Sequence, residues 1–172
     1  RAGHRHLAAA VSARFAAPGF WHPASLIATV GGIGLSPVAP GTLGSAIALP
    51  LAWGLQLAGG PELLFGASAL LFLVGWWAAQ SYIDRTAAED PPAVVVDEVV
   101  AQWLVLLLVP LNPWLYLLSF ALFRLFDIVK PWPVSLADQR IKGGFGTMLD
   151  DLLAAVYAGI ALAFCGYVWG RL

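Results

Sequence analysis

Five of the ten acidic residues in this 172-residue chain lie at the ends of strongly apolar segments. They are Asp97, Glu98, Asp127, Asp150 and Asp151. A carboxylate beside hydrocarbon is unfavourable unless it is paired, protonated or bound to a cation. Oxygen ligands are also those that Mg²⁺ prefers, commonly together with the phosphates of a substrate. These side chains therefore predict a site that holds a hard metal ion at a membrane surface.

Asp127 is the most informative of the five, because it follows the apolar segment 99–126, where the negative end of a helix dipole disfavours an anion. Pairing with Arg124, three residues earlier, offers a purely structural explanation. Lys130 opens the rigid segment Lys130-Pro131-Trp132-Pro133, which would hold an ammonium group at headgroup level, and lysine is a good partner for phosphate. Asp127 could bind a metal ion and Lys130, three residues later, could bind a phosphate group. Together they predict one side of a catalytic site.

The two acidic pairs have a simpler explanation as helix caps, since each precedes an apolar segment and carboxylates suit a helix N-terminus. Against capping alone, Asp97 and Glu98 follow the apolar residues 93–96, and Asp150 and Asp151 follow a glycine-rich stretch. A second glycine-rich segment, 31–45, leads into an apolar helix, and its amides could bind an anion. That signal is weak by itself, because Thr42 could cap the helix and glycines also permit close packing.

The composition predicts an integral membrane protein. The chain is 60% hydrophobic and 11% charged, with a mean hydropathy of +0.80, whereas soluble domains are about 25% charged. The net charge of −1 gives no indication of a nucleic-acid partner. The single cysteine, Cys165, excludes a disulfide framework, and the three histidines lie within the first 22 residues, which excludes a histidine-based zinc site in the body.

We expect an all-α integral membrane protein, a compact polytopic bundle of short and kinked transmembrane helices. The N-terminal basic arm, 1–25, is expected to be cytoplasmic or interfacial, and residues 26–172 to form a single membrane-embedded catalytic domain. The segments 63–79 and 152–169 are long enough to span a bilayer. The segment 43–58 is short and should kink at Pro50.

The segment 99–126 is interrupted by Pro110-Leu111-Asn112-Pro113, which makes a good turn. A single crossing would put Asp97-Glu98 and Asp127 on opposite faces of the membrane. A hairpin that turns at Asn112 would return both to one face, and this is the arrangement we favour. Each arm then has about 13 residues, or roughly 20 Å of helix, so we expect tilted short helices or local thinning of the bilayer.

The basic residues predict the orientation. Most of the Lys and Arg lie in the N-terminal arm and in the loop 127–151, and basic loops stay in the cytoplasm. They are Arg1, Arg5, Arg14, Lys130, Arg140 and Lys142. In this topology every acidic cluster faces the cytoplasm.

Four blocks of the sequence, in order, resemble the phosphatidylglycerophosphatase A family of bacterial membranes. The blocks are Gly34-Leu35-Ser36-Pro37 with Ala39-Pro40-Gly41-Thr42-Leu43-Gly44-Ser45, then Asp97-Glu98-Val99-Val100, then Phe123-Arg124-Leu125-Phe126-Asp127-Ile128-Val129-Lys130-Pro131-Trp132-Pro133, and Lys142-Gly143-Gly144-Phe145-Gly146-Thr147-Met148-Leu149-Asp150-Asp151. Together they cover roughly residues 30–165. Ala101 departs from the pattern, because the family leads us to expect a glycine there.

The resemblance implies Mg²⁺-dependent phosphomonoester hydrolysis of the membrane lipid phosphatidylglycerophosphate, which gives phosphatidylglycerol and inorganic phosphate in phospholipid biosynthesis. It implies a multi-pass protein of the bacterial cytoplasmic (inner) membrane with its active site facing the cytoplasm. The implied catalytic residues are Asp97, Glu98, Asp127, Lys130, Asp150 and Asp151, and the five acids among them are the implied metal ligands. The implied substrate-binding residues are Thr42, Ser45, Arg124, Lys130 and Lys142.

Two alternatives stay open at the level of the sequence. In the reaction, a carboxylate could activate water or could itself attack the phosphorus and form an acyl phosphate. In function, a small cation transporter lined by carboxylates, or a non-enzymatic membrane protein, would also carry acids at membrane depth. Carriers tend to place such acids in the middle of a helix, whereas these lie at segment ends.

Overall fold

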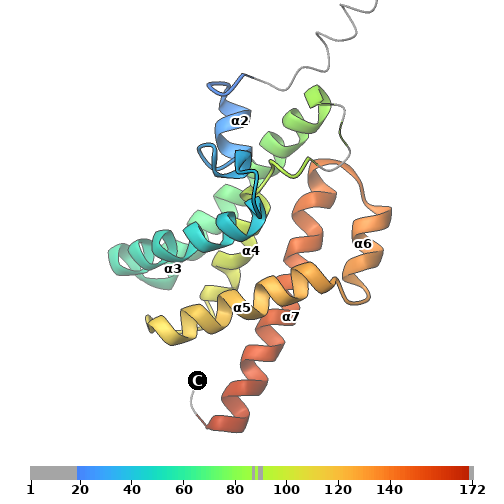
Figure 1. The fold of residues 1–172 in the computed structure, drawn as a ribbon. Coiled ribbons are helices and arrows are strands. Elements are labelled where there is room, and N and C mark those ends of the chain that lie inside the picture. The colour runs from blue at the N-terminus through green and yellow to red at the C-terminus, as the bar shows by residue number, and fades with distance from the viewer. Residues whose placement is uncertain (1–18, 87, 89–90, 171–172) are drawn as a thin grey trace, which may run out of the picture.

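The computed structural model describes residues 19–86, 88 and 91–170, and within these residues every regular element is helical. The expected all-α class is therefore confirmed. The elements are α2 (Pro23–Ala28), the short 3₁₀ helix η1 (Ile33–Leu35), α3 (Pro40–Thr86), α4 (Val96–Leu106), α5 (Pro113–Val129), α6 (Val134–Arg140) and α7 (Gly143–Trp169) (Figure 1). The arginines of the basic arm, Arg1, Arg5 and Arg14, lie outside the described residues. Helix α2 spans the boundary expected between residues 25 and 26 and packs on α3.

Helix α3 consists of two helices joined at Gly59 and Gly60, where the backbone leaves helical geometry. Gly60 has a φ of 70°, a conformation that a residue with a side chain rarely adopts. The chain stays helical through Pro50, so the reversal is made by the two glycines. Gly60 is followed by Pro61, which suits the first turn of the returning helix.

The two halves of α3 fold back on each other. Gly44 of the first half packs against Val95, and Gly75 of the second half packs against the next residue, Val96. In one straight helix these two glycines would be about 47 Å apart. The start of α4 is therefore held between the two halves of α3, which fixes the position of its first turn.

Helices α4 and α5 carry their acidic residues to the same end of the molecule. Asn112 caps the start of α5, where its Oδ1 accepts hydrogen bonds from the backbone N–H groups of Trp114 (2.9 Å) and Leu115 (3.2 Å). At the other end of α5, Arg124 lies 3.9 Å from Glu98 in the first turn of α4.

The 11 residues of α4 and 17 of α5 correspond to about 16 and 26 Å of helix. Helix α5 packs mainly on α7 (Figure 1).

Two helices among the described residues, α3 and α7, are long and apolar enough to cross a membrane by length and composition. The interior between the helices is apolar and combines small with large side chains, such as Ala52, Leu64, Leu106, Phe123 and Ala158. Many large apolar side chains point outward, as expected where lipid is the solvent. Trp21, Trp114 and Trp132 are more than 70% exposed, which fits the aromatic belt of a membrane interface.

Candidate active site

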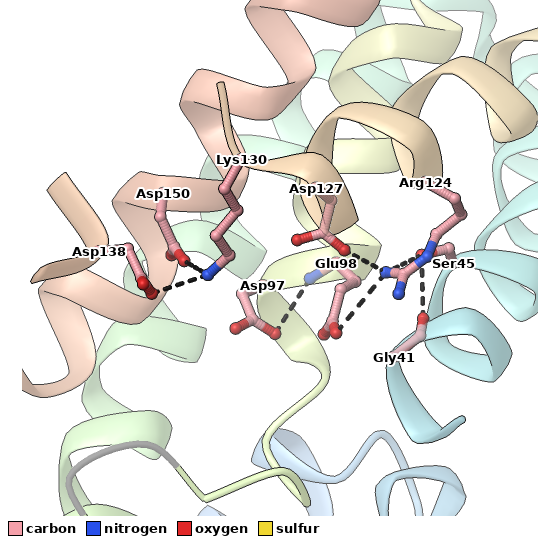
Figure 2. A network of polar contacts seen from close by, with 9 residues as sticks. All are labelled: Gly41, Ser45, Asp97, Glu98, Arg124, Asp127, Lys130, Asp138 and Asp150. Carbon is pink, nitrogen blue, oxygen red and sulfur yellow. Dashed lines mark hydrogen bonds and ion pairs between the residues drawn. The ribbon is translucent and has the colours of Figure 1, made fainter. Parts of the chain in front are cut away.

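All five carboxylates line one open pocket of about 360 Å³, which we call the carboxylate pocket. Asp97 and Glu98 come from the first turn of α4, Asp127 from the last turn of α5, and Asp150 and Asp151 from α7. Residues 39–42 at the start of α3 close another side. Figure 2 shows acidic side chains of α4, α5 and α7 converging, with Lys130 among them and Arg124 at one side, next to Ser45. The sequence thus predicted which acids meet, and the structure divides them into three groups.

Asp97, Glu98 and Asp151 form the group that fits a metal ion. Each offers one oxygen, and the three oxygens lie within 4.8 Å of one another. Among the described residues, Glu98 Oε2 and Asp151 Oδ2 are buried without a hydrogen-bond partner. Burial raises the pKa of Asp97 well above its usual range, and repulsion from Glu98 and Asp151 adds to the shift. A cation would satisfy these oxygens and relieve the repulsion, and an all-oxygen donor set suits Mg²⁺.

Asp127 is paired with Arg124, which is the structural alternative that its position at a helix C-terminus had left open. Arg124 Nη1 lies 2.6 Å from Asp127 Oδ2, 3.9 Å from Glu98 Oε1 and 3.3 Å from Ser45 Oγ (Figure 2). One guanidinium group thus joins α3, α4 and α5. Arg124 was predicted to contact substrate, and in the structure its Nη1 is directed to these protein atoms.

Asp150 belongs to a separate ionic group around Lys130. The Lys130 ammonium lies 2.6 Å from Asp150 Oδ2 and 2.7 Å from Asp138 Oδ1. Burial acts to lower the pKa of Lys130, but the hydrogen bonds to the two carboxylates outweigh it and raise the pKa above the usual value. Lys130 therefore stays positive at neutral pH. Asp138, on α6, was missed by sequence reasoning because nothing in the sequence separates it from an exposed surface acid.

Three glycines of segment 31–45, namely Gly34, Gly41 and Gly44, permit close packing against residues 93–98. A Cβ atom on Gly34 would overlap the carbonyl oxygen of Ala93, and one on Gly41 would overlap Glu98 Oε1 and come within 3.3 Å of Arg124 Nη1. Gly44 packs against Val95 in the same way. This glycine-rich face of the 31–45 segment therefore lets residues 93–98 approach closely enough to place the acidic pair.

The remaining predicted substrate-binding residues, Thr42, Ser45 and Lys142, differ in whether they line the carboxylate pocket. Thr42 lines the carboxylate pocket, and since α3 begins at Pro40 it lies inside the first turn and does not cap the helix. Ser45 is buried, and its hydroxyl donates to the carbonyl of Gly41 (3.0 Å) while accepting from Arg124. Lys142 is exposed at the start of α7 and lines a small neighbouring cavity of about 20 Å³, which shares Thr147 and Asp150 with the carboxylate pocket. The structure therefore brings Thr42 to the pocket but not Lys142.

Comparison with known proteins identifies the family to which this chain is similar. The family model described as phosphatidylglycerophosphatase A matches residues 26–165. A protein of Escherichia coli strain K12 named "Phosphatidylglycerophosphatase A" is 34% identical over 151 residues, which cover 87% of this chain and 85% of the relative. A protein of the same name from Haemophilus influenzae is 39% identical over 142 residues, with 82% and 87% covered.

A relative with a different name is also similar. A protein of Bacteroides thetaiotaomicron named "Putative phosphatidylinositol-3-phosphatase" is 44% identical over 152 residues, which cover 84% of this chain and 94% of the relative. No solved structure matches the chain. All the matched proteins are thus named for the removal of phosphate from a phospholipid headgroup.

Proposed function

We propose, because this chain belongs to the phosphatidylglycerophosphatase A family and is a lipid phosphatase, that its substrate is phosphatidylglycerophosphate. In the proposed reaction this lipid and water give phosphatidylglycerol and inorganic phosphate. We propose further that Asp97, Glu98 and Asp151 hold Mg²⁺ for this reaction. The observation that carries the proposal is the convergence of their three oxygens within 4.8 Å in a pocket that Lys130 also lines.

The other charged groups of the pocket have separate roles in the proposed reaction. The ion, when bound, supplies positive charge at the phosphoryl oxygens. Two N–H groups of Lys130 are used by Asp138 and Asp150, and its third can donate to a phosphate oxygen. Arg124 holds Asp127 and Glu98 in place through its Nη1.

Asp127 is the carboxylate best placed to orient the attacking water and take up its proton. Arg124 binds only its Oδ2, and the other oxygen points away from Arg124 toward the side where Lys130 lies (Figure 2). The water oxygen forms a bond to phosphorus as the bond from phosphorus to the lipid oxygen breaks, and that oxygen takes a proton from solvent. Trapping of ³²P on the acid-quenched protein would instead show that a carboxylate attacks directly.

In the proposed topology the carboxylate pocket faces the cytoplasm of the inner membrane. The two halves of α3 and the helix α7 cross the bilayer, and the shorter α4 and α5 are packed between them. Lys130, Arg140 and Lys142 all lie at the pocket end of α5, α6 and α7, and basic residues favour the cytoplasmic side. The lipid headgroup would then reach the pocket from the cytoplasmic leaflet.

Removal of the metal tests this proposal. The protein, purified in detergent, is given phosphatidylglycerophosphate in mixed micelles, and released phosphate is measured with Mg²⁺, after EDTA, and after Mg²⁺ is restored. We expect release only in the first and third conditions. Release that persists in EDTA would contradict the metal assignment, and no release in any condition would favour a cation transporter or a non-enzymatic protein.

Phosphatidylinositol 3-phosphate is the second candidate substrate, because the Bacteroides relative is named for a phosphatase of this lipid. Both lipids carry a terminal phosphomonoester, and either could use the same charged groups. The same assay with both lipids, compared by kcat/KM, decides between them. We expect the higher value for phosphatidylglycerophosphate, and the opposite order would transfer the substrate assignment to the inositol lipid.

Lys130→Gln is expected to raise KM about 10-fold with a smaller change in kcat, because a charge-assisted hydrogen bond contributes about 1.5–3 kcal/mol. Glutamine keeps an N–H donor for Asp138 or Asp150 but has no charge for the phosphate. The measurement is a titration of substrate in micelles. Arg140→Gln, which removes an exposed charge outside the pocket, serves as the control. Equal KM values for the two variants would show that Lys130 does not contact the substrate.

A further inference from the structure

An apolar groove lies beside the carboxylate pocket, between η1 and the first turns of α3. Its volume is about 610 Å³, within the usual range for pockets that hold small ligands. Ile33, Leu35, Leu43 and Ile47 supply most of its apolar lining. Leu35 is 52% exposed and Leu43 is 44% exposed, so these side chains line an open surface instead of packing in the core.

The groove lies next to the pocket along one face of α3. Pro40 lines the pocket, and Leu43 and Ile47, three and seven residues later on the same helical face, line the groove. Pro40 of the pocket and Ile47 are about 10 Å apart along the axis. The groove therefore leads from the headgroup site along a helix long and apolar enough to span the bilayer.

Two other apolar grooves are less well connected to the pocket. One includes Pro113 and Tyr116 at the start of α5, about 20 Å of helix from Asp127. The other lies between α3, α4 and α7, and Val100, its residue on α4 closest in sequence to Asp97, is only 1% exposed, so that end is closed. Of these three grooves, the one at Leu43 is open and lies on the helical face of α3 that leads to the pocket.

We propose that this groove receives an acyl chain of the lipid substrate while the phosphate lies in the carboxylate pocket; this rests on the proposed lipid phosphatase function. Lipid tails are as apolar as leucine, so the groove gains little affinity over the surrounding bilayer. Its effect is orientation: a chain held along α3 restricts where the headgroup can lie relative to Asp97, Glu98 and Asp151, and restricted geometry lowers the barrier to reaction.

Filling the groove tests the proposal. Ala46 lines it and is exposed, so Ala46→Phe adds a ring inside the groove without overpacking the core. We expect kcat/KM for dioleoyl phosphatidylglycerophosphate to fall about 5- to 10-fold. For a water-soluble dibutyryl analogue, whose chains are too short to use the groove, we expect no more than a 2-fold change. Leu43→Trp, which fills the groove from another position, should give the same pattern if Ala46→Phe fails to fold.

Ala163→Phe is the matched control, because Ala163 is an exposed alanine on α7 that lines none of these grooves. It should leave both substrates unaffected. A filled-groove variant that loses activity equally on both substrates, or matches the Ala163→Phe control on the long-chain lipid, would overturn the acyl-chain assignment. Failure of the unchanged protein to release phosphate from either substrate would instead overturn the proposed function.

Discussion

Asp151→Asn is expected to lower Mg²⁺-dependent phosphate release about 1000-fold while the protein still folds. Asp151 contributes one of the three converging oxygens and is only 4% exposed. An amide keeps the shape of the side chain but removes the negative charge that binds the ion. The loss corresponds to about 4 kcal/mol of transition-state stabilisation, within what a metal ion supplies. Half-maximal activity should also require more Mg²⁺.

A second measurement separates loss of the metal from loss of the fold. Asp151 lies close enough to Glu98 and Asp127 for their charges to repel, so the amide should leave the Tm of the metal-free protein unchanged or raised. Added Mg²⁺ should raise the Tm of the unchanged protein, because an ion that binds only the folded state stabilises it, but should not raise that of the variant. Asp84→Asn, at an exposed acid on α3, is the control. Activity of Asp151→Asn near that of Asp84→Asn would contradict the ligand assignment.

Gly41→Ala is expected to lower activity about 100-fold although it adds a single methyl group. That group would overlap Glu98 Oε1 and crowd Arg124 Nη1. Because the overlapped atom is the end of a flexible side chain, the carboxylate can turn aside while the backbone stays in place. A displacement of about 1 Å at a reacting centre can cost about 100-fold in rate.

The stability of Gly41→Ala distinguishes displaced chemistry from misfolding. Alanine favours a helix over glycine by up to about 1 kcal/mol, so the metal-free Tm should not fall much. Gly54→Ala provides a matched control in the same half of α3, since a Cβ at Gly54 meets nothing within 4 Å. It should retain full activity. If Gly41→Ala were as active as Gly54→Ala, Glu98 would not be held at the metal site by this contact.

The sequence was sufficient to predict the helical class and to identify the acids that share a pocket. Those predictions depend on local patterns: long apolar segments, proline-flanked turns, and carboxylates at the ends of helices. Asp127 was predictable in more detail, because an acid at a helix C-terminus needs a nearby cation and Arg124 is the residue one turn earlier. The catalytic and metal-binding roles assigned to these residues remain predictions.

The division of the acids among partners could not be read from the sequence. Asp150 and Asp151 are adjacent, yet one is bonded to Lys130 and the other faces Asp97 and Glu98, a difference set by the rotation of α7 against α5 and α6. The role of Gly41 was equally hidden, because its partner Glu98 lies more than fifty residues away. Both features depend on tertiary packing, which a local sequence pattern does not report.

In the proposed metal site, the origin of the three oxygens also sets when activity would begin during biosynthesis. Asp97 and Glu98 lie on α4, whereas Asp151 lies on α7, which is synthesised after α5 and α6. A nascent chain is made from its N-terminus and folds as it emerges. A chain inserted only as far as α5 would already have the apolar groove beside α3 but would lack Asp151, the third proposed ligand. On this proposed assignment, hydrolysis of membrane lipid would begin only when the last helix is in place.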